Sequence, residues 1–590
     1  MKGVLFALLL IILALPVGAQ RMTLARNGKS GWVILLAPGS SAPMRHGAEE
    51  IQRHLMLMSG ARLPIFQPEA GAAGWPQGAR GAIVIADDAI LAKREHRPRL
   101  PAEGFRIRTI TPQSRHDIPR IEICGDNRRG ALYGCYALLE DVLGCRWFTA
   151  KISRIPHRKT ITVGPLNIRE QPAFEYREPY YTEAFDRDWA VRNRVNGNSQ
   201  RLDETVGGRV AYGKFVHTFN ELVPPEQYFD THPEYFSLIN GKRMKGYYQL
   251  CLTNPDVLRI SIEKVRAWIR ENPTATIFSV SQNDTYNNCQ CDNCKAIERE
   301  EGAPSGPVLR FVNAVADAIA AEAPHVLIDT LAYQWTEAPP KHVKPRPNVR
   351  IRLAPIGACF GHGIDACDAN KRVLENLAAW AQITHQLYVW HYSTNFANYL
   401  QPLPDLDEIA ADIPLFKKYG VVGLFYEGCY APGGGGEMSE LKAYLMAKLM
   451  WNPSRPAQPI ITEFLKGVYG KGAPAIQQWL DLLHADVRAK KVHPRIYDPP
   501  TAAYLSDDTL TKGAALFDRA LKDTASDPVA HEQVERARLA LEYVQWMRAP
   551  AGSRERAEFA KTVTDKLHRY GIGQVREGEP VEKFLQRVAP

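Results

Sequence analysis

Two acidic residues stand at or near the ends of apolar runs, where their carboxylates could do acid–base chemistry. Asp284 follows the run 276–280 after the polar stretch 281–283, and Glu427 ends the run 421–427. Short runs rich in β-branched and aromatic residues predict buried strands. Two carboxylates in a partly dry cleft have pKa values that are pushed apart, so one can donate a proton while the other stays charged. The alternatives are a loop cap for Asp284 and an ion pair for Glu427.

The elements that would position these carboxylates are strands that alternate with helical runs from about residue 171 to residue 452. Eight strands are predicted, at residues 174–178, 214–219, 248–253, 276–280, 326–333, 349–354, 386–392 and 421–427. Consecutive units of this kind predict a (β/α)8 TIM barrel, in which the residues just past the strands share one face.

Different patterns flank the predicted barrel. Before it, we expect strands at 32–36, 81–86 and 121–125 and helices at 48–58 and 129–141; after it, we expect helices at 460–469, 473–488, 510–522 and 531–547. The predicted layout is a signal peptide at 1–19, a small α/β domain at 20–168, the barrel at 169–452 and a helical C-terminal domain at 453–590. A chain of 590 residues is long enough for several domains.

The N-terminus and the composition bear on where the protein works. Lys2, the apolar run 4–17 and Ala19 predict a secretory signal peptide that is cut after Ala19, since the run is too short to span a bilayer. We therefore expect an exported protein, periplasmic or secreted, without membrane insertion. The formal net charge of +9 comes from interspersed acidic and basic residues, which disfavours nucleic acid as a partner.

Residues near the predicted strand ends suggest a carbohydrate site. We expect substrate contacts from His217, Asn254, Gln282, Tyr333, Trp335, His391, Asn395 and Tyr426. Aromatic rings offer flat faces to sugars, and amides match hydroxyl and acetamido groups. Glycoside hydrolysis needs a carboxylic acid at the leaving oxygen and a second group at the oxocarbenium-like centre, for which we expect Asp284 and Glu427. Asn283, beside Asp284, adds an amide that could orient a substrate acetamide.

Motifs for other chemistries are missing. No Gly-rich phosphate loop follows a predicted strand, and the sequence contains neither a HExxH motif nor a serine elbow. We therefore expect no cofactor.

A cysteine cluster follows Asp284, at Cys289, Cys291 and Cys294. Three thiolates at this spacing could bind zinc if a fourth ligand arrived. Candidates for that ligand are Cys359, Cys367 and His362. Export favours a disulfide instead, either between Cys291 and Cys294 or to one of the later cysteines. We expect structural cysteines and no metal.

Several of these stretches resemble a known family. They are His217-Thr218-Phe219, the run 228–236, Ser281-Gln282-Asn283-Asp284, the cysteine cluster with Ser305, Leu331-Ala332-Tyr333, and Tyr426-Glu427-Gly428. Together they resemble the bacterial domain of unknown function 4838, which defines glycoside hydrolase family 163. The stretch 121–148 resembles the small domain that precedes the barrel in hexosaminidases and α-glucuronidases.

The resemblance implies an endo-β-N-acetylglucosaminidase that releases N-glycans from glycoproteins. Together with the two carboxylates, this resemblance predicts an exported, retaining glycoside hydrolase that cleaves a β-linked N-acetylglucosamine. A substrate-assisted mechanism, in which the acetamide of the substrate acts as the nucleophile, is one possible form of this reaction. The carbohydrate, or the glycan of a glycoprotein, would be its partner. A glycosidase for a uronic-acid polysaccharide and a non-catalytic carbohydrate-binding barrel are the alternatives.

Overall fold

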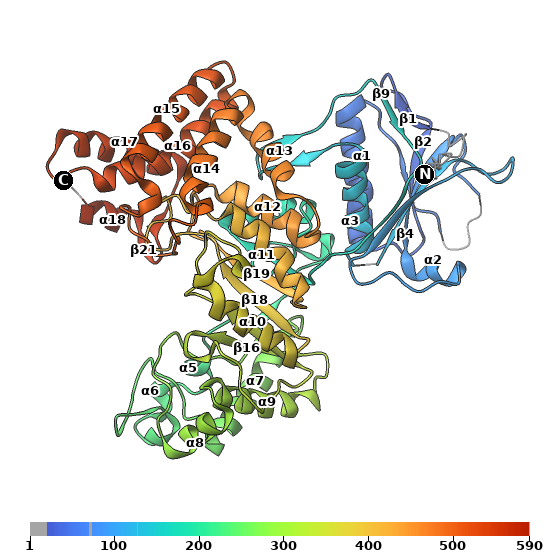
Figure 1. Cartoon of the computed structure of the whole chain (residues 1–590). Coiled ribbons are helices and arrows are strands. Elements are labelled where there is room, and N and C mark those ends of the chain that lie inside the picture. The colour runs from blue at the N-terminus through green and yellow to red at the C-terminus, as the bar shows by residue number, and fades with distance from the viewer. Residues whose placement is uncertain (1–20, 70–73, 127, 589–590) are drawn as a thin grey trace, which may run out of the picture. The chain divides into compact units, whose positions relative to one another are not determined.

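The computed structural model describes residues 21–69, 74–126 and 128–588, and these form two compact units (Figure 1). Unit 1 contains the described residues up to Arg146 together with Ile155–Gln171 and Glu204–Gly207. Unit 2 contains Trp147–Arg154, Pro172–Asp203 and the described residues from Gly208 onward. The predicted signal peptide lies outside the described residues. Within the described residues, no helix is both long and apolar enough to cross a membrane.

Unit 1 is built on a six-stranded mixed sheet with the order β10-β5-β6-β4-β2-β3. The strands are β2 (Trp32–Leu36), β3 (Ile65–Phe66), β4 (Gly81–Asp87), β5 (Phe105–Ile110), β6 (Arg120–Gly125) and β10 (Asn167–Glu170). Helices α1 (Ala42–Ser59) and α3 (Gly130–Ala137) pack together; α1 is capped at its C-terminus by Gly60, whose φ of 78° suits a residue without a Cβ. The predicted strands and helices of this region are confirmed, whereas β3, β5 and β10 of the sheet were not predicted.

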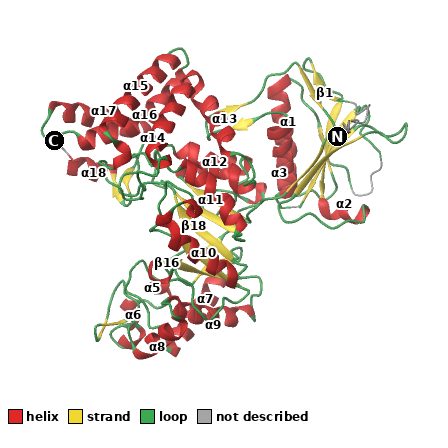
Figure 2. Cartoon of the chain, viewed as in Figure 1, coloured by secondary structure: helices red, strands yellow, loops and turns green. Residues whose placement is uncertain are grey.

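Unit 2 contains a curled, seven-stranded parallel sheet with the order β11-β19-β18-β17-β16-β15-β12 (Figure 2). Its strands are β11 (Tyr176–Tyr180), β12 (Tyr212–Lys214), β15 (Ile277–Ser279), β16 (Leu327–Tyr333), β17 (Val349–Ala354), β18 (Leu387–Tyr392) and β19 (Gly423–Glu427). The curl brings the two edge strands together, with the rings of Tyr176 and Tyr212 5.9 Å apart. The short segment 196–198 bridges them: Asn196 N–H donates to Arg177 O (3.2 Å), and Tyr212 N–H donates to the Asn198 side chain (2.9 Å).

The predicted third strand, 248–253, does not form, so the described sheet has seven strands instead of the predicted eight. Leu250 makes only an isolated bridge with Phe236. Gln249 instead donates through Nε2 to Asn283 O at 2.8 Å, so the segment is tied to the loop after β15. The prediction was wrong because an apolar run of six residues is compatible with a strand and with a buried loop alike.

Helices cover the curled sheet and continue after it. Those that alternate with the segments of the sheet are α7 (Pro255–Glu271), α8 (Asp292–Glu301), α9 (Ser305–Ala320), α10 (Lys371–Ile383), α11 (Leu406–Lys418) and α12 (Ser439–Trp451). The later ones, which pack in succession, are α13 (Ala457–Tyr469), α14 (Ala473–Arg488), α15 (Asp507–Thr524), α16 (Pro528–Arg548) and α17 (Arg554–Tyr570). The first four of these helices were predicted, whereas α17 was not. The hairpin β20 (Gln574–Arg576) to β21 (Glu579–Pro580) then precedes α18 (Val581–Val588).

Candidate active site

A cavity of about 310 Å³ lies at the carboxyl ends of the curled sheet. Its polar lining residues are His217, Asp284, Glu427 and Glu577, and its aromatic ones are Tyr180, Phe215, Tyr333, Trp390, Tyr392, Phe396, Phe425, Tyr430 and Tyr497. Because side chains alternate along a strand, every second residue points into the cavity. Examples are Trp390 and Tyr392 of β18, and Phe425 and Glu427 of β19. Asp284 and Glu427 therefore meet in one aromatic-walled cavity.

Glu427 is the buried acid of this cavity, with a relative exposure of 9%. Its Oε2 accepts a hydrogen bond from Trp390 Nε1 at 2.9 Å. Burial above all raises the pKa of Glu427; the Trp390 hydrogen bond opposes the rise, the nearby charges of Glu577 and Asp284 add to it, and the resulting pKa is about 8. Glu427 therefore carries a proton at neutral pH, which is the state that a general acid needs.

Asp284 is the exposed carboxylate, held at the loop after β15. Its Oδ1 accepts hydrogen bonds from Tyr333 Oη and Gln334 Nε2, each at 3.1 Å, and its backbone N–H donates to the Tyr247 hydroxyl at 3.1 Å. Gln334 has a φ of 53°, which is uncommon for a residue with a Cβ and aims its amide at Asp284. Two donors on one oxygen orient this carboxylate.

His217 completes the polar lining, also with a φ of 53°. Its Nδ1 lies 2.7 Å from the Gln282 carbonyl oxygen, so Nδ1 carries the hydrogen and donates it. Burial lowers the pKa of His217, which keeps the ring neutral. A neutral imidazole with Nδ1 engaged leaves Nε2 as an acceptor for a substrate hydroxyl.

Two cavity residues come from the region predicted as a helical tail, where no site residue was expected. Tyr497 lies in the loop after α14, and Glu577 lies in the turn between β20 and β21. Glu577 Oε1 accepts a hydrogen bond from Tyr430 Oη at 2.7 Å. No motif in the sequence marks either residue, because the link to the barrel is made only through space.

The structure does not bring Asn283 and Gln282 into the cavity. Both side chains are fully buried. Asn283 Nδ2 donates to Asn220 Oδ1 (2.7 Å) and Tyr248 O (2.6 Å), while Gln282 Nε2 donates to Tyr333 O (3.1 Å) and Thr336 Oγ1 (2.7 Å). These amides position the loop of Asp284 and have no free face for an acetamide.

His391 and Tyr426 point away from the cavity, since each adjoins a residue of its strand that points inward. His391 is fully buried with Nε2 2.6 Å from Glu408 Oε1 on α11, and Tyr426 is fully buried with its ring 5.1 Å from that of His391. The parity of the strand could have shown this, because Glu427 and Tyr426 cannot both face inward.

Three more predicted contact residues lie outside the cavity lining. Asn254 caps α7, accepting from Asp256 N at 2.9 Å. Asn395 is buried and donates to Asp498 O at 2.8 Å. Trp335 donates through Nε1 to Thr285 O at 3.0 Å, behind the loop that carries Asp284. Of the predicted contacts, only His217 and Tyr333 line the cavity with Asp284 and Glu427.

The cysteines also depart from the prediction. All ten lie in described residues, and each carries a free thiol. Cys289, Cys291 and Cys294 gather with Cys251, which was not among the expected partners. The expected ones, Cys359, His362 and Cys367, form a separate group with His493. The predicted disulfide, between Cys291 and Cys294 or to one of the later cysteines, is not formed, since all of these thiols are free. The sulfurs of Cys251 and Cys291 are 3.7 Å apart, against roughly 2 Å for a disulfide.

Comparison with known proteins identifies the family. The chain belongs to the family described as Domain of unknown function (DUF4838), which matches residues 147–481. That range contains all strands of the curled sheet, the helices α7 to α12, and both Asp284 and Glu427. No curated protein matches the chain.

Several solved structures are similar to the chain. One is a GH138 enzyme targeting pectin rhamnogalacturonan II, at 10% identity and a TM-score of 0.39, covering 94% of this chain and 98% of that one. Another is a family 89 glycoside hydrolase from Clostridium perfringens in complex with its substrate GlcNAc-alpha-1,4-galactose, at 10% identity and a TM-score of 0.46, covering 89% of this chain and 64% of that one. The family 89 glycoside hydrolase from the same organism in complex with PUGNAc gives 10% identity, a TM-score of 0.46 and coverages of 92% and 64%.

Proposed function

We propose that the protein is a glycoside hydrolase in which Glu427 is the general acid. The observation that carries this proposal is a buried carboxyl with its pKa raised to about 8, in an aromatic cavity that also contains the exposed carboxylate Asp284. Protonation of the glycosidic oxygen needs an acid that keeps its proton at the working pH. The second carboxylate then stabilises the oxocarbenium-like transition state, directly or through the substrate.

The proposed substrate is a β-linked N-acetylglucosamine. In a substrate-assisted reaction the acetamide oxygen attacks the anomeric carbon, and the protein orients the acetamide. Asn283 is engaged elsewhere, so this role falls to Asp284, which can accept the acetamide N–H and which the Tyr333 hydroxyl orients. Phe215 and Trp390 supply the flat apolar faces that a pyranose ring needs.

Exposed tyrosines support endo action on a longer glycan. Tyr497, which lines the cavity, is 56% exposed, and Tyr247, which hydrogen-bonds to Asp284, is 52% exposed. Rings left open to solvent beside a sugar site can stack on further sugar units, such as those of an N-glycan.

The uronic-acid alternative is less favoured by the charges. None of the described residues that line the cavity is lysine or arginine, whereas three are carboxylic acids. A uronate would meet this acidic lining without a cationic partner.

Export remains part of the proposal and rests on residues 1–19. N-terminal sequencing of the exported protein should give Gln20 as the first residue, and a sequence that begins at Met1 would contradict export.

The test is a screen of purified protein against aryl β-N-acetylglucosaminides, aryl uronides and N-glycosylated proteins. Asp284→Asn and Glu427→Gln should each lower kcat by about 10²- to 10⁴-fold and leave folding intact, because each removes a group that acts in the transition state. Asp230→Asn is the matched control, since Asp230 is an exposed carboxylate that pairs with Lys245 at 2.8 Å and does not line the cavity. Glycan binding without turnover in the wild type would support the non-catalytic barrel instead.

A further inference from the structure

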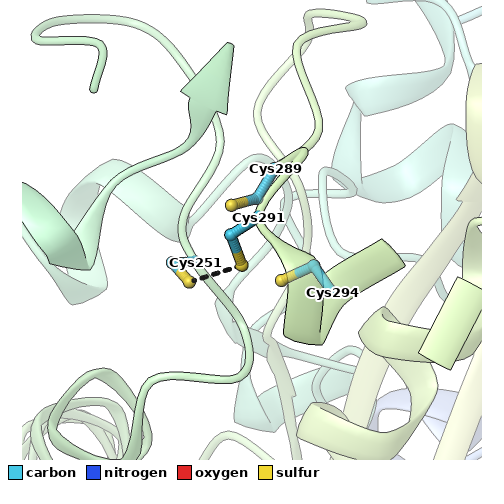
Figure 3. A group of neighbouring side chains, drawn as sticks. All are labelled: Cys251, Cys289, Cys291 and Cys294. Carbon is cyan, nitrogen blue, oxygen red and sulfur yellow. Dashed lines mark hydrogen bonds between the residues drawn. The ribbon is translucent and has the colours of Figure 1, made fainter. Parts of the chain in front are cut away.

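Four cysteines from separate segments converge beside the loop of Asp284 (Figure 3). Cys251 lies in the segment after the hairpin β13 (Leu238–Ile239) to β14 (Lys242–Arg243), Cys289 and Cys291 lie in the loop after β15, and Cys294 lies in the first turn of α8. Their four sulfurs all lie within 4.8 Å of one another. Figure 3 shows the side chains turned toward a common centre.

The spacing of the sulfurs distinguishes a metal site from a disulfide. Zinc binds thiolates at about 2.3 Å in a tetrahedron, which places the sulfurs ~3.8 Å apart. Cys251 Sγ and Cys291 Sγ are 3.7 Å apart, whereas a disulfide needs about 2.05 Å. The cluster therefore has the dimensions of a tetrathiolate zinc site.

The surroundings suit the negative charge of four thiolates on one zinc ion. Leu238 N–H donates to Cys289 Sγ at 3.4 Å, and Arg243 Nη1 donates to the same sulfur at 3.8 Å. Thr253 Oγ1 lies 3.3 Å from Cys294 Sγ. Donors to the sulfurs and the positive end of α8 stabilise thiolates, as the outer contacts of metal ligands commonly do.

We propose that Cys251, Cys289, Cys291 and Cys294 bind one structural zinc ion that fixes the loop carrying Asp284. Four protein ligands leave no open position, so the zinc would take no part in chemistry. The loop between Asp284 and the cluster is also held through Thr285 O, which accepts from Gln249 Nε2 at 2.7 Å.

An independent observation points to a second site, at Cys359, His362, Cys367 and His493. Their ligand atoms also lie within 4.8 Å of one another, with Cys359 Sγ 3.2 Å from His362 Nδ1 and Cys367 Sγ 3.4 Å from His493 Nδ1.

The tautomer of His362 supports a metal-binding role. Its Nε2 lies 2.7 Å from the Val487 carbonyl oxygen, so Nε2 donates its hydrogen there and the lone pair at Nδ1 faces Cys359. A histidine that ligates zinc is oriented in this way by its second nitrogen. We infer that this set binds a second structural zinc ion, and it would fix the loop of Tyr497, which follows His493 closely in the chain.

The test measures zinc by elemental analysis of the full-length mature protein, purified without chelator or reductant. The expected content is about two zinc ions per chain. Cys251→Ser and Cys289→Ser should each remove about one of them, and Cys359→Ser and His493→Ala should each remove the other. The two groups of variants control for each other, and Cys145→Ser, at a buried cysteine outside both clusters, should retain both ions.

Thiol titration and cobalt substitution keep the proposal testable if a variant fails to fold. After denaturation with chelator, all ten cysteines of the wild type should react as free thiols. Cobalt(II) exchanged into the wild type should show sulfur-to-cobalt charge-transfer bands and tetrahedral visible bands. Zinc-free protein with fewer than ten reactive thiols would overturn the proposal in favour of disulfides. Unchanged zinc content in a folded Cys251→Ser variant would overturn the first site. These readouts do not depend on glycosidase activity, so they remain informative if the proposed function fails.

Discussion

Replacement of Glu427 by glutamine should change how stability depends on pH. Burial raises the pKa of Glu427 from an ordinary 4.5 to about 8. At about 1.4 kcal/mol per pH unit, ionising this carboxyl in the folded protein costs roughly 5 kcal/mol more than in the unfolded chain. The amide of glutamine keeps the shape and the acceptor for Trp390 Nε1 but cannot ionise.

The sign follows from proton linkage. Between about pH 4.5 and pH 8 the folded protein keeps the proton of Glu427, while the unfolded chain has lost it. The stability contributed by this group is therefore fully present below pH 4.5 and is lost as pH rises to about 8. Relative to the wild type, Glu427→Gln should become steadily more stable across this window and level off above it.

The assay measures the thermal unfolding midpoint of wild type, Glu427→Gln and Asp230→Asn, in steps from pH 5 to pH 9 at constant ionic strength. The value of kcat/KM is measured for the wild type over the same pH range. The difference between Glu427→Gln and wild type should grow with pH, whereas Asp230→Asn should run parallel to the wild type. In the same range, wild-type kcat/KM should fall as pH rises through about 8, because the acid loses its proton. A difference in midpoint that stays constant with pH would refute the raised pKa and, with it, the assignment of the acid.

Two further predictions concern the neighbours of the carboxylates. Glu577→Gln removes a negative charge that raises the pKa of Glu427, so the alkaline limb of kcat/KM should move to lower pH; an unmoved limb would show that Glu577 is not electrostatically linked to the acid. Tyr333→Phe removes the hydroxyl that donates to Asp284 at 3.1 Å, and kcat should fall by about 10-fold with a smaller change in KM, whereas a change in KM alone would make Tyr333 a binding residue only.

The sequence alone was enough to locate the two carboxylates. One apolar run ends shortly before Asp284 and another ends at Glu427, and parallel strands bring their carboxyl ends to one face, so local pattern and one topological rule sufficed. Helices α13 to α16 followed equally from their periodicity, whereas α17 and α18 were not predicted. These features depend on neighbours along the chain, which a sequence shows directly.

Only the tertiary structure decided what surrounds the carboxylates. Neighbouring residues of a strand face opposite sides of the sheet, so His391 of β18 and Tyr426 of β19 face the helices while the residues beside them face the cavity. Only the curl of the sheet decides which of the two sides becomes the inner one. Glu577 reaches the cavity from 150 positions beyond Glu427, and Cys251 joins a cluster whose next member lies 38 residues later. Such contacts follow from how distant segments pack, and packing leaves no periodic trace in the local sequence.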